Sequence, residues 1–143
     1  MTSTRGRADR REDARAVVVV ALGGALGATA RYAVDVAAER WGIALPWATL
    51  AVNILGCALM GLLVAYVLAN PARHLLWRPF LGVGVLGGFT TFSAFAADAV
   101  LLADKGAGVT SAAYVVATLA GGLLALWGGT SLGRALRRRG PVA

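Results

Sequence analysis

The residues of this chain with the most distinctive chemistry lie together in one apolar stretch, residues 87–95. They read Gly-Gly-Phe-Thr-Thr-Phe-Ser-Ala-Phe. Adjacent glycines lose much backbone entropy in a helix, and threonine hydroxyls can bond to the local backbone. We therefore expect a helix through this stretch to be broken, at Gly87-Gly88. The carbonyl groups freed by such a break could coordinate a cation where protein or a water-filled cavity covers them.

Phenylalanines flank the threonines and the serine of this stretch. Phe92 and Phe95 are three residues apart and share a helix face, with Phe89 close by. An aromatic ring has a positive edge, so two rings turned edge-on could stabilise a dehydrated anion. Packing against lipid or against a neighbouring helix is the commoner use of such rings, and it stays open as the alternative.

Further polar side chains occur in pairs on two other apolar stretches. Thr49 and Asn53 are four residues apart, as are Tyr114 and Thr118, so each pair occupies one helix face. The Asn53 amide could join two helices or donate a hydrogen bond to an anion. Tyr114 and Thr118 could form a ladder of hydroxyl groups, although a tyrosine near the end of a span also serves as an interfacial anchor.

Charged residues are scarce inside the apolar stretches. Arg31 follows a small-residue pattern, Gly23 to Gly27, and either reaches up to the membrane interface or lines a water-filled vestibule that concentrates anions. Asp98, one turn beyond Phe95, is expected at the wet interface, because no acidic partner for a proton relay occupies the centre of any apolar stretch. No nucleophile–base pair, phosphate-binding loop or metal-ligand cluster is recognisable, so the sequence argues against an enzyme.

The composition indicates which elements must position these residues. Of the 143 residues, 58% are hydrophobic and 15% are charged, and 19 are glycines. Because soluble domains carry about 25% charged residues, we expect an all-α integral membrane protein with no separate catalytic domain. Apolar stretches of about 20 residues predict four transmembrane helices. The expected spans are residues 16–38, 44–69, 79–102 and 108–133, with the third broken at mid-membrane.

The charged segments outside the spans predict the topology. A single membrane domain, residues 16–136, lies between a solvated tail of mixed charge, residues 1–15, and a basic tail, residues 137–143. The net charge of +7 is concentrated at the two ends and in the second loop, which share one side of the membrane. The positive-inside rule places both termini in the cytoplasm. Since no aromatic residues alternate with these arginines, we expect contact with membrane lipid and none with nucleic acid.

The run at residues 87–95 resembles the signature of the Fluc (CrcB) family of fluoride channels. The patterns Gly24-x-x-Gly27-Ala28-x-x-Arg31-Tyr32 and Thr49-x-x-Val52-Asn53-x-x-Gly56 are similar to the other motifs of that family, and the resemblance covers the chain after its N-terminal tail. It implies a fluoride-selective channel that exports fluoride passively across the plasma membrane and so lowers fluoride toxicity in the cytoplasm. It also implies an antiparallel dimer of four-helix subunits with two fluoride pathways.

The resemblance also assigns roles to individual residues. It implies that the backbone carbonyls of Gly87 and Thr90, with those of a second subunit, bind a structural Na⁺ ion, and that Arg31 lies in a vestibule. The side chains implied along the fluoride pathway are those of Thr49, Asn53, Thr91, Phe92, Ser93, Phe95, Tyr114 and Thr118. The chain departs from the usual family pattern at Ala94, where threonine is common, at Gly122, where a polar residue is common, and at Asp98, where glutamate is commoner.

The choice of partner and two rival functions stay open. Eleven arginines fall on the predicted cytoplasmic side, against three basic residues on the other, and this bias favours a single orientation. An antiparallel dimer would then form either from two copies of the chain or with an oppositely oriented paralogue. The rivals are a small dimeric multidrug transporter, which is disfavoured because the first span lacks a central glutamate, and a structural membrane assembly protein whose glycines only pack helices.

Overall fold

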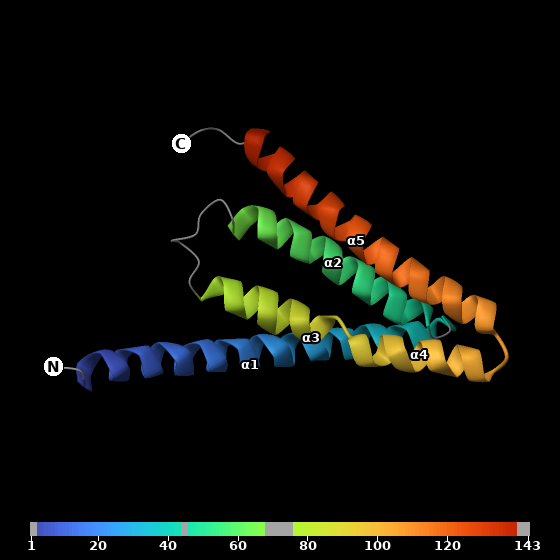
Figure 1. Cartoon of the computed structure of the whole chain (residues 1–143), viewed down its shortest axis with the longest axis horizontal. Coiled ribbons are helices and arrows are strands. Elements are labelled where there is room, and N and C mark those ends of the chain that lie inside the picture. The colour runs from blue at the N-terminus through green and yellow to red at the C-terminus, as the bar shows by residue number, and fades with distance from the viewer. Residues whose placement is uncertain (1–2, 44–45, 68–75, 140–143) are drawn as a thin grey trace.

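The structure, a computed structural model, describes residues 3–43, 46–67 and 76–139, and all regular secondary structure in these ranges is helical. The elements are α1 (Ser3–Arg40), α2 (Trp47–Val67), η2 (Pro79–Leu86), α3 (Gly87–Phe89), α4 (Phe92–Asp104) and α5 (Gly108–Arg139). Of these, η2, α3 and α4 follow one another along a single span (Figure 1). Four spans in the described ranges are long and apolar enough to cross a membrane. The chain is therefore an all-α, multi-pass membrane protein, as predicted.

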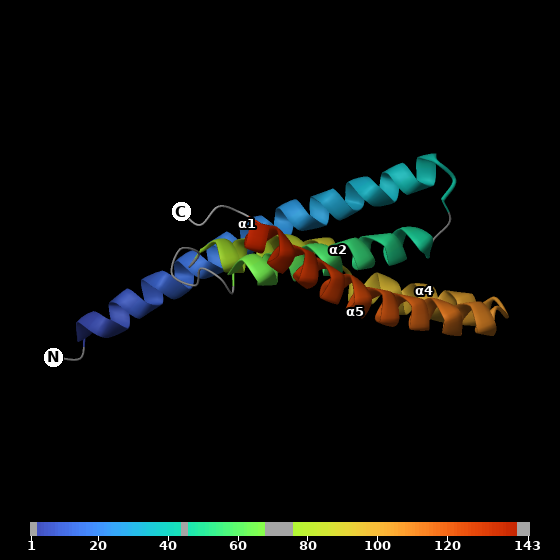
Figure 2. The same ribbon diagram turned by 90° about the horizontal axis from the view of Figure 1, so that it is seen from above.

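The helices pack as two pairs that are joined by the third span. Helix α2 packs along α5, whereas η2 and α3 pack against α1, and α4 packs against α5 (Figure 1). Seen from above, the N-terminal part of α1 projects beyond the other helices (Figure 2). The third span thus contacts α1 through its first half and α5 through its second half, so the point where it changes partner lies in the middle of the bundle.

Several helix ends differ from the expected limits of the spans. Helix α1 begins at Ser3, so the segment expected as a solvated tail continues the first helix, in keeping with its content of alanine, arginine and glutamate. Helix α5 continues to Arg139, where basic side chains favour a helix C-terminus. Helix α2 covers only Trp47–Val67. Residues 44–45, 68–69 and 140–143, which belong to the expected second span and the expected basic tail, lie outside the described ranges.

The contact between α1 and η2 depends on facing glycines. A Cβ atom on Gly84 would stand 2.9 Å from the Cα atom of Gly23, and a Cβ atom on Gly27 would collide with the carbonyl oxygen of Val85. A Cβ atom on Gly24 would meet no heavy atom within 4 Å. The small-residue pattern of α1 is therefore a packing face, and its members are unequal because only some of them lie directly against the η2 backbone.

We expect Gly27→Ala to destabilise the fold and Gly24→Ala to leave it unchanged or slightly more stable. The added methyl group at residue 27 forces α1 away from η2, at a cost of about 1–3 kcal/mol. At residue 24 the same change only improves helix propensity, by up to about 1 kcal/mol. Unfolding of the two purified variants in detergent measures the difference. Equal stabilities would show that the α1–η2 contact tolerates separation.

The third span leaves the helical conformation at Thr90 and Thr91. Thr90 has φ −75° and ψ 155°, and Thr91 has φ −143° and ψ 120°. Gly87, with φ −66° and ψ −34°, is helical. The extended residues are thus the threonines, whereas the adjacent glycines Gly87 and Gly88, where the break was expected, stay helical. Gly88 serves packing instead, because a Cβ atom there would collide with the carbonyl oxygen of Gly24.

Candidate functional site

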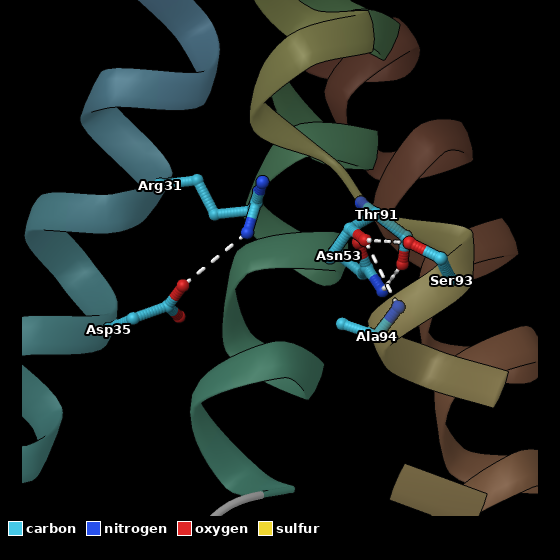
Figure 3. Close-up of polar contacts among 6 residues, drawn as sticks. All are labelled: Arg31, Asp35, Asn53, Thr91, Ser93 and Ala94. Atoms are coloured by element: carbon cyan, nitrogen blue, oxygen red, sulfur yellow. Dashed lines mark hydrogen bonds and ion pairs between the residues drawn. The ribbon is translucent and has the colours of Figure 1, made fainter. Parts of the chain in front are cut away.

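The non-helical segment is held by the side chain of Asn53, which reaches it from α2. The backbone N–H of Thr91 donates to Asn53 Oδ1 at 2.9 Å, and Asn53 Nδ2 donates to the carbonyl oxygen of Thr91 at 3.1 Å (Figure 3). One amide side chain therefore satisfies both polar backbone groups of an extended residue. Of the two uses expected for Asn53, joining helices is the one seen in this geometry, and a second N–H of its amide group is left for another acceptor.

The side chain of Thr91 then starts the next helix. Its Oγ1 accepts a hydrogen bond from the backbone N–H of Ala94 at 3.2 Å and lies 3.2 Å from Ser93 Oγ (Figure 3). A threonine that bonds to the third residue of a helix is a standard N-cap. Thr91 is thus fixed on both sides, by Asn53 through its backbone and by α4 through its hydroxyl group.

These two contacts change the environment of two carbonyl groups. In a regular α-helix the N–H of residue 91 would bond to the carbonyl of Gly87, and the N–H of residue 94 to the carbonyl of Thr90. Here the first N–H bonds to Asn53 and the second to the Thr91 hydroxyl. The carbonyl oxygens of Gly87 and Thr90 thereby lose their helical donors, so they fit the carbonyl donor set that a cation site in a broken helix uses. The described residues contain no cluster of His, Cys, Asp and Glu that could hold a metal.

Aromatic rings lead from the protein surface into the bundle beside the same segment. Phe92 is 78% exposed, whereas Phe95 is 8% exposed and Tyr114 only 2%. The ring centroids of Phe92 and Phe95 are 5.6 Å apart, and those of Phe95 and Tyr114 are 5.5 Å apart. The structure therefore brings the three rings expected along the pathway into one continuous row.

A group of buried polar side chains adjoins the inner end of this row, and its members are Thr49, Asp98, Tyr114 and Thr118. Thr118 Oγ1 donates to the carbonyl oxygen of Tyr114 at 2.8 Å. Within the described part of the chain, Tyr114 Oη and Asp98 Oδ2 are buried without a hydrogen-bond partner. Tyr114 is thus no exposed interfacial anchor, and its hydroxyl group lies among buried polar side chains.

Asp98 was expected at the wet interface, and its side chain is only 8% exposed in the bundle. Its side chain is buried because α4 packs against α5. A 2.7 Å hydrogen bond, which Ser111 Oγ donates to the carbonyl oxygen of Ala99, stabilises this contact. The sequence carried one signal for this position, since Asp98 follows Phe95 by three residues and therefore shares its face.

Two hollows meet at Thr91. The first, which we call the Phe92 groove, has a volume of about 500 Å³, and its polar lining comes from Asn53, Thr90, Thr91 and Thr118. The second, which we call the Arg31 cavity, has a volume of about 390 Å³ and is lined in part by Arg31, Asp35, Thr49 and Asp98. Thr91 lines both hollows. The segment held by Asn53 is therefore the partition between a polar cavity and an aromatic groove.

The Arg31 cavity contains an ion pair. Arg31 Nη1 lies 3.4 Å from Asp35 Oδ2, and the two side chains are 31% and 32% exposed (Figure 3). Arg31 Nε is buried and bonds to no described residue. The structure thus places Arg31 in a cavity and adds Asp35 as its partner, which the sequence argument did not identify. That this cavity is a vestibule stays a prediction.

Comparison with known proteins agrees with this arrangement. The family profile described as "CrcB-like protein, Camphor Resistance (CrcB)" matches residues 18–130. The chain belongs to the CrcB family. It is 48% identical over 117 residues to "Fluoride-specific ion channel FluC" of Paracoccus denitrificans, covering 82% of this chain and 93% of that one. It is also 48% identical over 121 residues to the protein of that name from Agrobacterium fabrum, covering 84% and 97%. "Fluoride-specific ion channel FluC 1" of Streptomyces coelicolor is 44% identical over 121 residues.

The part of the chain that matches the CrcB family includes every site residue described above. The structure also bears on two positions at which the chain departs from the usual CrcB pattern. Ala94 contributes its backbone N–H to the Thr91 cap, and a methyl side chain suffices for that contact. A Cβ atom on Gly122 would stand 3.3 Å from Cys57 Sγ. Glycine at residue 122 therefore leaves room for Cys57 in the Phe92 groove, which both residues line.

Proposed function

We propose that the chain is a fluoride-selective channel that lets fluoride leave the cytoplasm passively across the plasma membrane. The observation that carries this proposal is the partition at Thr91, where a polar cavity and an aromatic groove meet across a non-helical segment. The relatives named as fluoride-specific ion channels support the choice of ion. A small anion that sheds water needs hydrogen-bond donors and positive ring edges along its path. Asn53, Tyr114 and the phenylalanines are groups of that kind, and Thr49, Ser93 and Thr118 add hydroxyls beside them.

We also propose that the extended threonines lie at mid-membrane and that a Na⁺ ion binds to the backbone carbonyl oxygens beside them. Carbonyl oxygens without helical donors are tolerated at that depth where protein covers them or where an ion uses them. The carbonyls of Gly87 and Thr90 lose those donors to Asn53 and Thr91. Two oxygens are too few to replace the hydration shell of a cation, so the site requires a second set.

An antiparallel dimer would supply that second set and close the Phe92 groove. Phe92 is 78% exposed in the single chain, and the groove beside it is open and apolar over most of its surface. A second subunit related by an axis through the non-helical segment would bring two more carbonyls to the ion and cover both phenylalanines.

The partner is either a second copy or an oppositely oriented paralogue, and the arginine bias favours cytoplasmic termini for this chain. Reporter fusions at both ends test the orientation, and equal signals on the two sides would overturn a fixed one.

The decisive experiment is fluoride efflux from liposomes that contain the purified chain, with chloride as the competing anion. We expect rapid efflux of fluoride and none of chloride, without any dependence on a proton gradient. If the chain alone gives no fluoride efflux, the measurement is repeated with an oppositely oriented paralogue. Absence of fluoride flux in both cases would refute the channel and leave a structural role in the membrane.

Removal of Na⁺ is expected to weaken assembly or conduction. Because the proposed ion joins the carbonyls of two subunits, exchange of Na⁺ for a bulky organic cation should release the dimer or slow fluoride efflux. Flux and subunit exchange are measured in parallel, with K⁺ as a second replacement. If both properties are indifferent to Na⁺, the site at Gly87 and Thr90 does not exist.

Asp35→Asn is expected to increase fluoride flux at low ionic strength. The substitution frees the Arg31 guanidinium and removes a negative charge from the cavity. A partly exposed ion pair is worth up to about 1 kcal/mol, so we expect an increase of about two- to fivefold that disappears at high salt. Glu39→Gln is the matched control, because Glu39 lines the same cavity. An equal increase in both variants would mean that the overall charge matters and the pairing with Arg31 does not.

A further inference from the structure

A third hollow lies apart from the proposed ion path, between α2, η2 and α5. It has a volume of about 510 Å³, and its walls come from leucines and valine of the three helices, among them Leu59, Leu63, Leu81, Val85 and Leu136. The one charged residue of its lining is Arg137, at one end. A smaller hollow shares Leu63 and Leu81 with it and extends toward Trp77. We call this surface the Arg137 groove.

The Arg137 groove and the Phe92 groove open on opposite sides of α2. Asn53 and Cys57 line the Phe92 groove, whereas Leu59 and Tyr66 line the Arg137 groove. Tyr66 follows Cys57 by nine residues, which is about two and a half helical turns, so the two side chains project in opposite directions. On α5 the two grooves share one face, because Leu126 lines the first and Gly133, seven residues further on, lines the second. We take the Arg137 groove to face lipid, and a cross-link at residue 59 tests whether a second subunit covers it instead.

The guanidinium group of Arg137 is held at the mouth of this groove. Its Nη1 donates to the carbonyl oxygen of Ala65, in the last turn of α2, at 3.3 Å. A cation is favourable there because the carbonyls at a helix C-terminus carry partial negative charge. Guanidinium has five N–H donors, and this contact uses one of them. Arg134 and Arg138, both exposed, flank it on α5 and raise the positive potential at this end of the molecule.

From this arrangement we propose that the Arg137 groove binds an anionic phospholipid. The phosphate group is held by Arg137, and one acyl chain lies along the leucines between α2 and η2. Basic pockets between transmembrane helices on the cytoplasmic side are suited to anionic headgroups. Trp77 beside the groove is exposed, and tryptophan is enriched at the membrane interface. Charge complementarity and the apolar walls together select a lipid over free phosphate. The inference does not depend on which ion the chain conducts.

The test is lipid binding by the full chain in detergent, with phosphatidylglycerol and phosphatidylcholine of the same acyl chains as probes. Retention in native mass spectrometry and the shift in unfolding temperature are both recorded. We expect the unaltered chain to retain phosphatidylglycerol selectively. Arg137→Gln should weaken this binding at least about tenfold, as the loss of charge-assisted hydrogen bonds implies. Arg138→Gln removes the same charge one residue further on and should weaken it by no more than about fivefold.

Further experiments identify what occupies the Arg137 groove. Leu59→Trp fills the groove without altering its charge and should displace the lipid. Inorganic phosphate should not reproduce the stabilisation, and if it does, the groove contributes nothing and the proposal fails. Cysteine placed at residue 59 in a Cys57→Ala background should not cross-link two subunits in membranes, and efficient cross-linking would assign the groove to a second copy. Equal lipid binding by Arg137→Gln and Arg138→Gln would also overturn the proposal. Fluoride flux, measured on the same variants, separates failure of the lipid site from failure of the channel.

Discussion

Asn53→Ala is expected to lower both the stability of the protein and its fluoride flux. The substitution leaves the backbone N–H and carbonyl of Thr91 without the bonds of 2.9 Å and 3.1 Å that now satisfy them. Each unsatisfied group in a water-poor setting costs about 1–3 kcal/mol, so a loss of about 2–6 kcal/mol follows. Flux should fall at least about tenfold, because the partition at Thr91 loses its position and even 1.4 kcal/mol corresponds to a factor of ten.

Ser111→Ala is the matched control for this prediction. It also removes one hydrogen bond from a side chain to the backbone of another helix, the 2.7 Å bond to Ala99, but it lies outside both hollows that meet at Thr91. We expect a modest loss of stability and unchanged flux. Unfolding in detergent and efflux from liposomes are measured on both variants. An Asn53→Ala protein that conducts as the unaltered chain does would show that the contact with Thr91 is dispensable for the pathway.

The membrane spans and the side chains that share a helix face could be predicted because they depend on local chemistry, whereas the roles assigned to the site residues stay predictions. Apolar stretches of sufficient length predict helices that span the membrane, whatever packs around them, and Pro79 begins the third span as its missing N–H permits. The pairs at spacing four, such as Tyr114 and Thr118, share a helix face for the same reason. These expectations needed no knowledge of which helices are neighbours.

The details that were missed depend on which helices touch. The non-helical residues are the threonines because Asn53 satisfies the backbone of Thr91, and that bond joins residues 38 positions apart. The glycines stay helical because Gly88 packs against Gly24. Asp98 is buried because α4 packs against α5. Each of these results follows from contacts between helices, and a single sequence does not reveal the pairing of helices.

Phe92→Ile is expected to abolish fluoride flux while assembly of the protein is preserved. Isoleucine keeps an apolar side chain in the Phe92 groove but lacks the positive ring edge that is proposed to replace water around the ion. Because Phe92 is 78% exposed in the single chain, its replacement removes few contacts within the subunit. The change therefore acts on the pathway and not on the fold. Liposome efflux measures the first effect, and size-exclusion chromatography with unfolding in detergent measures the second.

Two variants give this prediction its control and its rescue. Phe80→Ile makes the same substitution in the same span, at a ring that packs edge-on against Trp77 with centroids 6.1 Å apart, and flux should be retained. Phe92→Tyr keeps a ring edge at the pathway and should conduct measurably. We therefore expect the fluoride flux to be highest for the unaltered chain and for Phe80→Ile. It should be intermediate for Phe92→Tyr and absent for Phe92→Ile. Normal conduction by Phe92→Ile would mean that the exposed ring only packs against its partner subunit, because an aliphatic side chain of similar bulk would then serve as well.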